Sequence, residues 1–401
     1  MNRWSDQLQF ELARLEADGL RRRLVPAEPC GRIIRRCGLN LVNLAGNDYL
    51  GFREDRRLKD AAIAAINACG VGSTASRVVV GHLPVHEQFE QRFAAFKHHE
   101  AALFCPSGYV ANLAVLTTLA TDADLICIDK LTHASLLDAA RASGAVTRAF
   151  AHLNYEKLQR LLARHAAATA GGQGTGRIRR RFIVTDSVFS MDGDVADLPR
   201  LCDLADRYEA VLVVDEAHAT GVLGPHGAGL AEHQGVAGRI DVAVSTAGKA
   251  LGGMGGIITA RRHVIDYLIT RARPFIYTTA VPPAQVATAC AALDLLVDEP
   301  HLRLRLVELC ERVRHQLRPS GLVTVVTKTP TPIIPLIAGT PAAASDLSLH
   351  LESEGFYAPA ITPPTVARGS SRVRLSLRAD LTDDDVDGLC AAVERWRGAG
   401  N

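Results

Sequence analysis

Between residues 45 and 285, short apolar runs alternate with longer stretches of helical periodicity, and this alternation limits the possible folds more than any other feature of the chain. Strands that alternate with helices need crossover connections, which produce a mostly parallel sheet covered by helices. We therefore predict a central α/β domain whose strands cover Ala102–Cys105, Leu125–Ile128, Phe182–Thr185, Val211–Asp215, Val242–Thr246 and Gly256–Thr259.

The two ends of the chain predict further parts. Residues 4–24 carry apolar residues at near-helical spacing, so we expect 1–45 to form an N-terminal helical arm. The helix periodicity of 284–318 comes before apolar runs at 322–327 and 333–337, a helix at 342–354 and a period-two strand at 371–377. We therefore predict a large α/β domain at 46–285 and a smaller C-terminal α+β domain at 286–401.

Composition excludes several classes of protein. Apolar residues make up 48% and charged residues 22%, as in an ordinary globular protein, and the net charge of +2 provides no field for nucleic acid. No apolar run is long enough for a membrane span, and the first residues lack the pattern of a signal peptide. The nine cysteines are scattered without a C-x-x-C pair, which argues against a metal site or a disulfide framework. We expect a cytoplasmic protein.

The segment Val211–His218 places an acid, Asp215, at the end of a buried strand, the edge where ligands bind in open α/β sheets. The letters Asp-Glu-Ala-His match the acidic box of a helicase-type ATPase, in which such an acid holds Mg²⁺. That function needs an upstream phosphate loop of the G-x-x-x-x-G-K-[ST] type, and the sequence has none. Glu216 is the residue that most suggests a helicase, so without the phosphate loop it is the least informative residue of the motif Asp215–His218.

Lys249 favours a different chemistry, that of pyridoxal phosphate. It lies in the glycine-rich turn Ser245–Gly256, where the backbone can approach a bulky ligand closely. A lysine there can hold an aldehyde as a Schiff base and later act as a base, while Asp215 keeps the pyridine nitrogen protonated. Burial next to cationic groups would lower the pKa of such a lysine.

Polar groups also follow other predicted strands. The turn Cys105–Asn112 opens a helix whose N-terminus could bind phosphate. His133 follows the strand at 125–128 and could stack on a flat ring, and Ser190 follows the strand at 182–185. Four strand ends therefore carry groups suited to one cofactor.

These motifs resemble the α-oxoamine synthases, which are fold-type I pyridoxal phosphate enzymes. The resemblance covers nearly the whole chain and rests on Gly46–Gly51, Gly72–Arg77, Thr132–Ser135, Phe189–Asp194, Asp215–His218, Thr246–Lys249 and Tyr277–Thr279. It implies an aspartate aminotransferase-like fold and an enzyme that joins a small amino acid to an acyl thioester with loss of CO₂ and release of the thiol. The segments Thr362–Val366 and Ser371–Arg374 resemble those of members that condense L-alanine with a pimeloyl thioester in biotin synthesis.

The resemblance also implies roles for single residues. Lys249, His133 and Asp215 would be catalytic. Contacts with pyridoxal 5'-phosphate would come from these three and from Gly108, Tyr109, Ser190, His218, Thr246, Thr278 and Thr279. Substrate would be bound by Arg21, Asn47, His133, Thr365 and Arg374, with Arg374 holding the amino-acid carboxylate. Thr278 and Thr279 of one subunit would contact the cofactor of the partner subunit, which implies a homodimer with its active site at the interface.

Two alternatives remain open from the sequence. Sibling enzymes of the same family use glycine or serine with other acyl thioesters, and the motifs are shared with them. The second alternative, a nucleotide hydrolase, lacks its phosphate loop. The sequence also leaves open whether the acyl group is carried by coenzyme A or by an acyl carrier protein.

Overall fold

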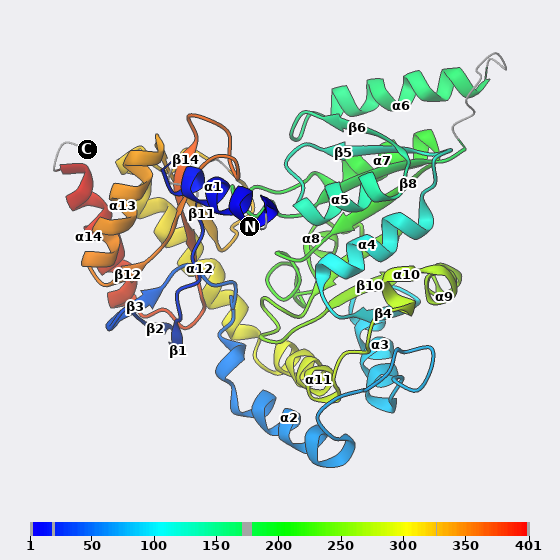
Figure 1. The fold of residues 1–401 in the computed structure, drawn as a ribbon, viewed down its shortest axis with the longest axis horizontal. Helices are drawn as coiled ribbons and strands as arrows, with labels where there is room; N and C mark the ends of the chain where they lie inside the picture. The colour runs from blue at the N-terminus through cyan, green and yellow to red at the C-terminus, as the bar shows by residue number, and fades with distance from the viewer. Residues whose placement is uncertain (1–2, 18–20, 171–178, 326, 399–401) are drawn as a thin grey trace.

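The computed structural model describes residues 3–17, 21–170, 179–325 and 327–398. Figure 1 shows a large unit built on one wide sheet, and beside it a smaller unit that contains both the strands nearest the N-terminus and the C-terminal helices. The predicted limits 1–45, 46–285 and 286–401 stay a prediction.

The wide sheet has seven strands in the order β4-β10-β9-β8-β7-β5-β6. The pairs β5/β6, β5/β7, β7/β8 and β8/β9 are parallel, whereas β10 is antiparallel to both its neighbours. All six predicted strands are confirmed, and β6 is added at the edge, where its burial is too uneven for an apolar run to mark it. The strands are β4 (Ala101–Cys105), β5 (Leu125–Asp129), β6 (Val146–Phe150), β7 (Arg181–Asp186), β8 (Ala210–Asp215), β9 (Val242–Thr246) and β10 (Gly256–Ala260).

These strands are continuous runs of apolar residues because helices cover both faces of the sheet. In β5, Leu125 and Cys127 enter one core, while Ile126 and Ile128 enter the other. Each such buried branched side chain contributes roughly 1.5–3 kcal/mol by leaving water. Helices α4 (Gly108–Leu119), α5 (Ala134–Ala142), α9 (Arg262–Arg271) and α10 (Arg273–Ile276) cover the second face, and α6 (Tyr155–Ala170) and α7 (Leu198–Tyr208) cover the first.

The helical segment predicted over 284–318 is confirmed, and the structure divides it into two helices. They are α11 (Pro283–Asp298) and α12 (Pro300–Leu317), and α11 packs on α2 (Arg56–Cys69) and α3 (Pro84–Phe96). Glu299 leaves the helical conformation, with φ −121° and ψ 54°, because the proline that follows it disfavours that conformation. A short helix, α8 (Leu230–His233), completes the large unit.

The smaller unit contains the sheet β11-β14-β13, formed by β11 (Ile333–Gly339), β13 (Ala360–Ile361) and β14 (Ser371–Ser376), with helices α13 (Pro341–Ser353) and α14 (Asp383–Gly398) beside it. The predicted helix at 342–354 and the strands at 333–337 and 371–377 are confirmed. The predicted strand at 322–327 is wrong for the residues described. Leu322 is buried and accepts a backbone hydrogen bond of 2.8 Å from Ile337, but no ladder continues from it.

Among the described residues of the N-terminal arm, the helix is α1 (Arg3–Ala17), and residues 21–24 of the helix predicted over 4–24 are not helical. Three antiparallel strands come after it, β1 (Glu28–Cys30), β2 (Ile33–Arg36) and β3 (Leu39–Asn43). Strand β3 then pairs in parallel with β12 (Phe356–Tyr357), so the arm is built into the smaller unit. Apolar periodicity missed this arrangement because β1 and β2 are only three and four residues long and bury a single side chain, that of Ile34.

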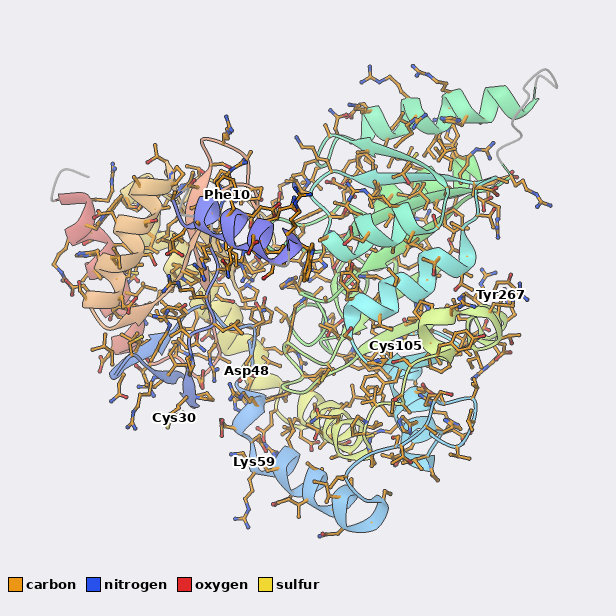
Figure 2. All side chains as sticks on the ribbon, in the orientation of Figure 1. Phe10, Cys30, Asp48, Lys59, Cys105 and Tyr267 are labelled. Carbon is orange, nitrogen blue, oxygen red and sulfur yellow. The ribbon has the colours of Figure 1, made fainter. Side chains whose placement is uncertain are left out.

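The cysteines are all free, and six of the nine are buried. Figure 2 shows Cys105 inside the large unit and Cys30 at the edge of the smaller one. Within the described residues, no helix has both the length and the apolar character needed to cross a membrane, and no group of His, Cys, Asp or Glu side chains is suited to hold a metal ion.

Candidate active site

A cavity of about 200 Å³ opens at the carboxyl ends of β5, β7, β8 and β9. It contains nine of the residues predicted for the site. Its lining comprises Asn47, Gly108, Tyr109, Asn112, His133, Ser135, Asp186, Val188, Ser190, Asp215, Ala217, His218, Thr246, Gly248 and Lys249. Residues up to two hundred positions apart in the sequence meet here because parallel strands end at one edge of the sheet.

Asp215 ends strand β8 and is held by two donors. Its Oδ2 accepts a hydrogen bond of 2.7 Å from the side-chain amide of Asn112, and its Oδ1 accepts the backbone N–H of Ala217 at 2.8 Å. The amide of Asn112 also donates to the hydroxyl of Ser135 at 2.9 Å. Both oxygens of this buried carboxylate are therefore held in place by N–H groups, which only donate.

Lys249 lies in the tight turn between β9 and β10. The turn is closed by backbone hydrogen bonds from Gly252 to Lys249 and from Gly253 to Ala247, at 2.9 Å and 2.8 Å. Gly252 has φ +67°, and a Cβ there would lie 2.7 Å from the backbone nitrogen of Arg53, so only glycine fits. Burial lowers the pKa of Lys249, although the nearby carboxylates oppose the shift.

His133 is the N-cap of α5, and Asp186 ends the neighbouring strand β7. The backbone N–H of His133 donates to Asp186 Oδ2 at 3.0 Å, and its Nδ1 lies 2.7 Å from the hydroxyl of Ser135. Burial, followed by the negative charge of Asp215, raises the pKa of Asp186 well above its usual range. Burial lowers the pKa of His133, so the ring is neutral at neutral pH.

A chain of polar contacts runs from His218 to the smaller unit. The hydroxyl of Tyr49 lies 2.7 Å from His218 Nδ1 and 3.3 Å from Asn47 Oδ1. The same oxygen of Asn47 accepts a hydrogen bond of 3.1 Å from Arg374, which projects from β14. Burial lowers the pKa of His218 well below its usual range, so this ring also stays neutral.

Two further strand ends complete the lining. Thr246 ends β9, and its hydroxyl donates to the carbonyl of Gly255 at 2.8 Å and accepts the N–H of Gly248 at 3.1 Å. Across the cavity, Gly108 and Tyr109 begin helix α4, which Ser107 caps by accepting the N–H of Val110. The N-terminus of α4 therefore presents backbone donors to the cavity.

Two buried oxygens at the cavity have no hydrogen-bond partner among the described residues. They are Asn112 Oδ1 and Asp186 Oδ1. Buried polar atoms of this kind are rare, and in a cavity they mark a place where a ligand or water completes the bonding. Together with the lysine, the carboxylate and the helix N-terminus, they fit a ligand that carries an aldehyde, a ring nitrogen and a phosphate.

Residues 40–393 match the family described as aminotransferase class I and II. The chain belongs to this family. It is 44% identical to the 8-amino-7-oxononanoate synthase of Anaeromyxobacter dehalogenans (strain 2CP-1) over 389 residues, which cover 97% of this chain and 94% of that protein. The expected resemblance and the fold-type I architecture are confirmed.

Solved structures of the family give the same fold. A serine palmitoyltransferase from S. paucimobilis with bound PLP-myriocin has a TM-score of 0.89 and 26% identity, and the match covers 98% of this chain and 97% of that one. An 8-amino-7-oxononanoate synthase from Francisella tularensis has a TM-score of 0.74 and 29% identity, covering 90% and 98%.

Five of the predicted residues do not line the cavity of the single chain. One of them, Arg374, reaches the lining through its hydrogen bond to Asn47. Arg21 and Thr365 line a second pocket, together with Leu15, Arg22 and residues 360–364. Thr278 and Thr279 lie in the segment between α10 and α11, next to the exposed Tyr277. Their predicted roles in binding substrate and a partner's cofactor stay predictions.

Four residues with polar side chains at this site were assigned no role from the sequence: Tyr49, Asn112, Ser135 and Asp186. Each lies inside a motif that the family resemblance covers or at a strand end already singled out. Asp186 offered the clearest signal, because it ends an apolar strand just as Asp215 does. The contacts of Tyr49 and Asn112 depend on tertiary packing across more than 100 residues, which no local pattern encodes.

Proposed function

We propose that this protein catalyses the decarboxylative condensation of L-alanine with a pimeloyl thioester, giving 8-amino-7-oxononanoate, CO₂ and free thiol in biotin biosynthesis, with pyridoxal 5'-phosphate as cofactor. The observation that carries the proposal is the cavity that joins Lys249, Asp215 and His133 in a chain 44% identical to an 8-amino-7-oxononanoate synthase. The orphaned oxygens at that cavity and the PLP-bound structural relative support the cofactor.

When bound, pyridoxal phosphate supplies an electron-withdrawing ring that stabilises negative charge at the substrate Cα. Asp215, oriented by Asn112, would keep the ring nitrogen protonated, and His133 would stack on the ring face. Ser190, His218 and Thr246 would contact the cofactor from the other strand ends. The first turn of α4, at Gly108 and Tyr109, would hold the phosphate.

Lys249 would hold the cofactor through Nζ and then act as the base. Its lowered pKa lets Nζ take the Cα proton of alanine near neutral pH. The new C–C bond forms at the thioester carbonyl, the C–S bond breaks and the thiolate leaves. The resulting β-keto acid loses CO₂, and Lys249 returns the proton to Cα. Arg374 and Asn47, joined by a hydrogen bond of 3.1 Å, would hold the substrate carboxylate.

A sibling reaction is the alternative. The serine palmitoyltransferase structure fits this chain with a higher TM-score than the 8-amino-7-oxononanoate synthase structure does, 0.89 against 0.74. Sequence identity to a relative of the second kind reaches 44%. Because the fold is shared and specificity depends on side chains, we give more weight to the sequence.

One assay separates these functions. Thiol release is measured with alanine, glycine and serine, each against pimeloyl and palmitoyl thioesters of coenzyme A and acyl carrier protein. We expect the highest kcat/KM with alanine and a pimeloyl thioester, and a preference for serine with a palmitoyl donor would overturn the proposal. In a second measurement, Lys249→Ala should lose the visible absorbance that wild type gains with pyridoxal phosphate.

We also include a homodimer in the proposal. Val78, Val79, Val80 and Tyr277 are exposed at 48%, 72%, 70% and 72%, and the two segments are joined by a hydrogen bond of 2.9 Å from Ala280 to Ala75. An apolar surface of this kind favours a protein partner. A second copy seated there would receive Thr278 and Thr279 at its own cofactor.

A further inference from the structure

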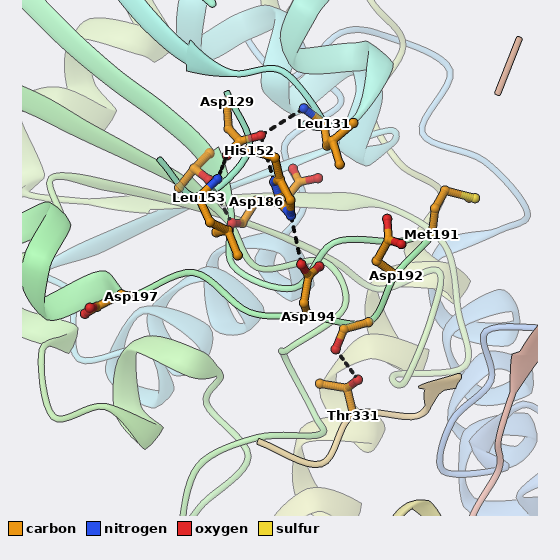
Figure 3. A network of polar contacts seen from close by, with 12 residues as sticks. Asp129, Leu131, His152, Leu153, Asp186, Met191, Asp192, Asp194, Asp197 and Thr331 are labelled. Carbon is orange, nitrogen blue, oxygen red and sulfur yellow. Dashed lines mark hydrogen bonds and ion pairs between the residues drawn. The ribbon is translucent and has the colours of Figure 1, made fainter. Parts of the chain in front are cut away.

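His152 lies between two carboxylates that belong to different loops of the site (Figure 3). Its Nδ1 is 3.0 Å from Asp129 Oδ1, and its Nε2 is 2.8 Å from Asp194 Oδ2. Because both carboxylates accept hydrogen bonds, a ring that donates to both must carry two protons. Burial alone would lower the pKa of His152, but the hydrogen bonds to Asp129 and Asp194 outweigh it and raise the pKa to about 9.

Asp129 anchors one end of this bridge in the sheet. It ends β5 and is buried, and its Oδ1 also accepts the backbone N–H of Leu131 at 2.9 Å. Its Oδ2 accepts the N–H of Leu153 at 2.9 Å. The turn that begins at Asp129 leads directly to His133 at the cavity.

Asp194 closes the hairpin that carries Ser190. The N–H of Phe189 donates to the carbonyl of Asp194 at 3.0 Å, and the N–H of Gly193 donates back to the carbonyl of Phe189 at 2.8 Å. Ser190 is the next residue and lines the cavity. The ring of His152 meets the ring of Phe189 edge-on, with centroids 4.3 Å apart and planes at 83°. His152 therefore contacts both residues that close the hairpin.

The smaller unit holds the same hairpin from its other side. The hydroxyl of Thr331 donates to the carbonyl of Gly193 at 2.6 Å (Figure 3). Arg372 donates to the carbonyl of Met191 at 3.1 Å and forms an ion pair with Asp192. These contacts fix the tip of the hairpin, while His152 fixes its base against the sheet.

We propose that His152 is a positioning residue, which holds Asp129 and Asp194 at a set separation and thereby places Ser190 relative to His133 across the cavity. The proposal rests on the proposed function, in which Ser190 and His133 both contact the cofactor. His152 does not line the cavity, so it acts through these two loops.

The first test uses the protein without cofactor, so that it does not depend on the proposed function. Amide hydrogen exchange is compared in wild type, His152→Gln and Asp194→Asn. The second variant removes the contact between His152 and Asp194 from the side of the carboxylate. We expect faster exchange in 187–197 in both variants, with unchanged exchange in β8. His226→Gln is the matched control, because it removes a histidine–carboxylate pair of 2.6 Å, to Glu232, that does not line the cavity. Unchanged exchange in 187–197 would overturn the proposal.

The second test measures pyridoxal phosphate binding to the same proteins by equilibrium titration. We expect His152→Gln to weaken binding by about tenfold or more, as loss of hydrogen bonds to charged groups predicts. In the double variant with Ser190→Ala, the two effects should not add, since both act through one hydroxyl. Additive effects would assign His152 a structural role only and overturn the proposal. Absence of binding in wild type would instead overturn the proposed function, and the exchange result would still decide whether His152 holds the hairpin.

Discussion

The side-chain amide of Asn112 donates a hydrogen bond of 2.7 Å to Asp215, and the same amide is held by the hydroxyl of Ser135. Since an N–H can only donate, this contact orients an accepting oxygen of Asp215. An accepting oxygen is what a protonated ring nitrogen requires, so the electron sink of the proposed reaction depends on a residue of helix α4.

Asn112→Asp tests this dependence without a change of size. It replaces the donor with a carboxyl group, so the hydrogen bond that orients Asp215 is lost and two accepting groups face each other. We expect kcat to fall roughly 10- to 100-fold, the equivalent of one hydrogen bond to a charged group. The measurement is kcat together with the visible spectrum against pH. Asn154→Asp, at the start of α6, is the control, because an aspartate can also accept the 2.8 Å bond from Lys157 N–H. Equal kcat values in the two variants would refute the dependence.

Glu216 contributes to stability through a buried ion pair with Lys97, and both side chains are almost fully buried. Its Oε1 also accepts the N–H of Ala231 at 3.0 Å. Glu216→Gln would leave the charge of Lys97 buried without its counterion, so we expect the free energy of unfolding to fall by about 3–5 kcal/mol. Equilibrium unfolding in urea measures it. The exposed pair of Glu156 and Arg200 serves as the control, since Glu156→Gln should lower the free energy of unfolding far less. Equal losses in the two variants would contradict the prediction.

His152 should make stability depend on pH. Its pKa is raised from 6.5 to about 9 by Asp129 and Asp194, so its contribution is fully present below pH about 6.5 and is lost as the pH rises through about 9. The difference in unfolding free energy between wild type and His152→Gln should therefore be largest at about pH 6 and shrink towards about pH 10. A difference that stays constant across this range would show that the ring is not charged in the folded protein.

The proposed dimer predicts complementation between two defective variants. Lys249→Ala lacks its lysine, and a chain with Thr278→Val and Thr279→Val lacks the residues lent to its partner. A mixed dimer then contains one intact site, so subunit exchange in an equal mixture should restore about a quarter of the wild-type activity. Sedimentation of each variant alone checks that both still assemble. No recovery from two assembled variants would show that each site is complete within one chain.

The sequence predicted the central sheet and the cavity residues well, because buried parallel strands leave apolar runs and the cofactor groups follow those runs directly. Asp215, His133 and Ser190 were found in this way, and Thr246 was found through the family resemblance. Residues whose role depends on packing between distant parts of the chain were not predicted. Tyr49 is an example, because its partner His218 is 169 positions away. Glu216 was set aside as uninformative, since nothing local shows that Lys97 lies beside it. The strands β1 and β2 were missed for a local reason, because strands of three and four residues with one buried side chain between them leave no apolar pattern.

Asp186 and Asp215 end adjacent strands as register partners, and the fold buries both acids at one cavity. Burying two acids together costs free energy, and the neighbouring Lys249 offsets this cost only in part, because the pKa of Asp186 stays well above its usual range. A ligand with a protonated ring nitrogen removes that penalty, and a ligand that binds only the native state stabilises it by mass action. The lifetime of this enzyme in its host should therefore follow the supply of vitamin B6, with chains made during scarcity unfolding and being degraded sooner than chains made in plenty.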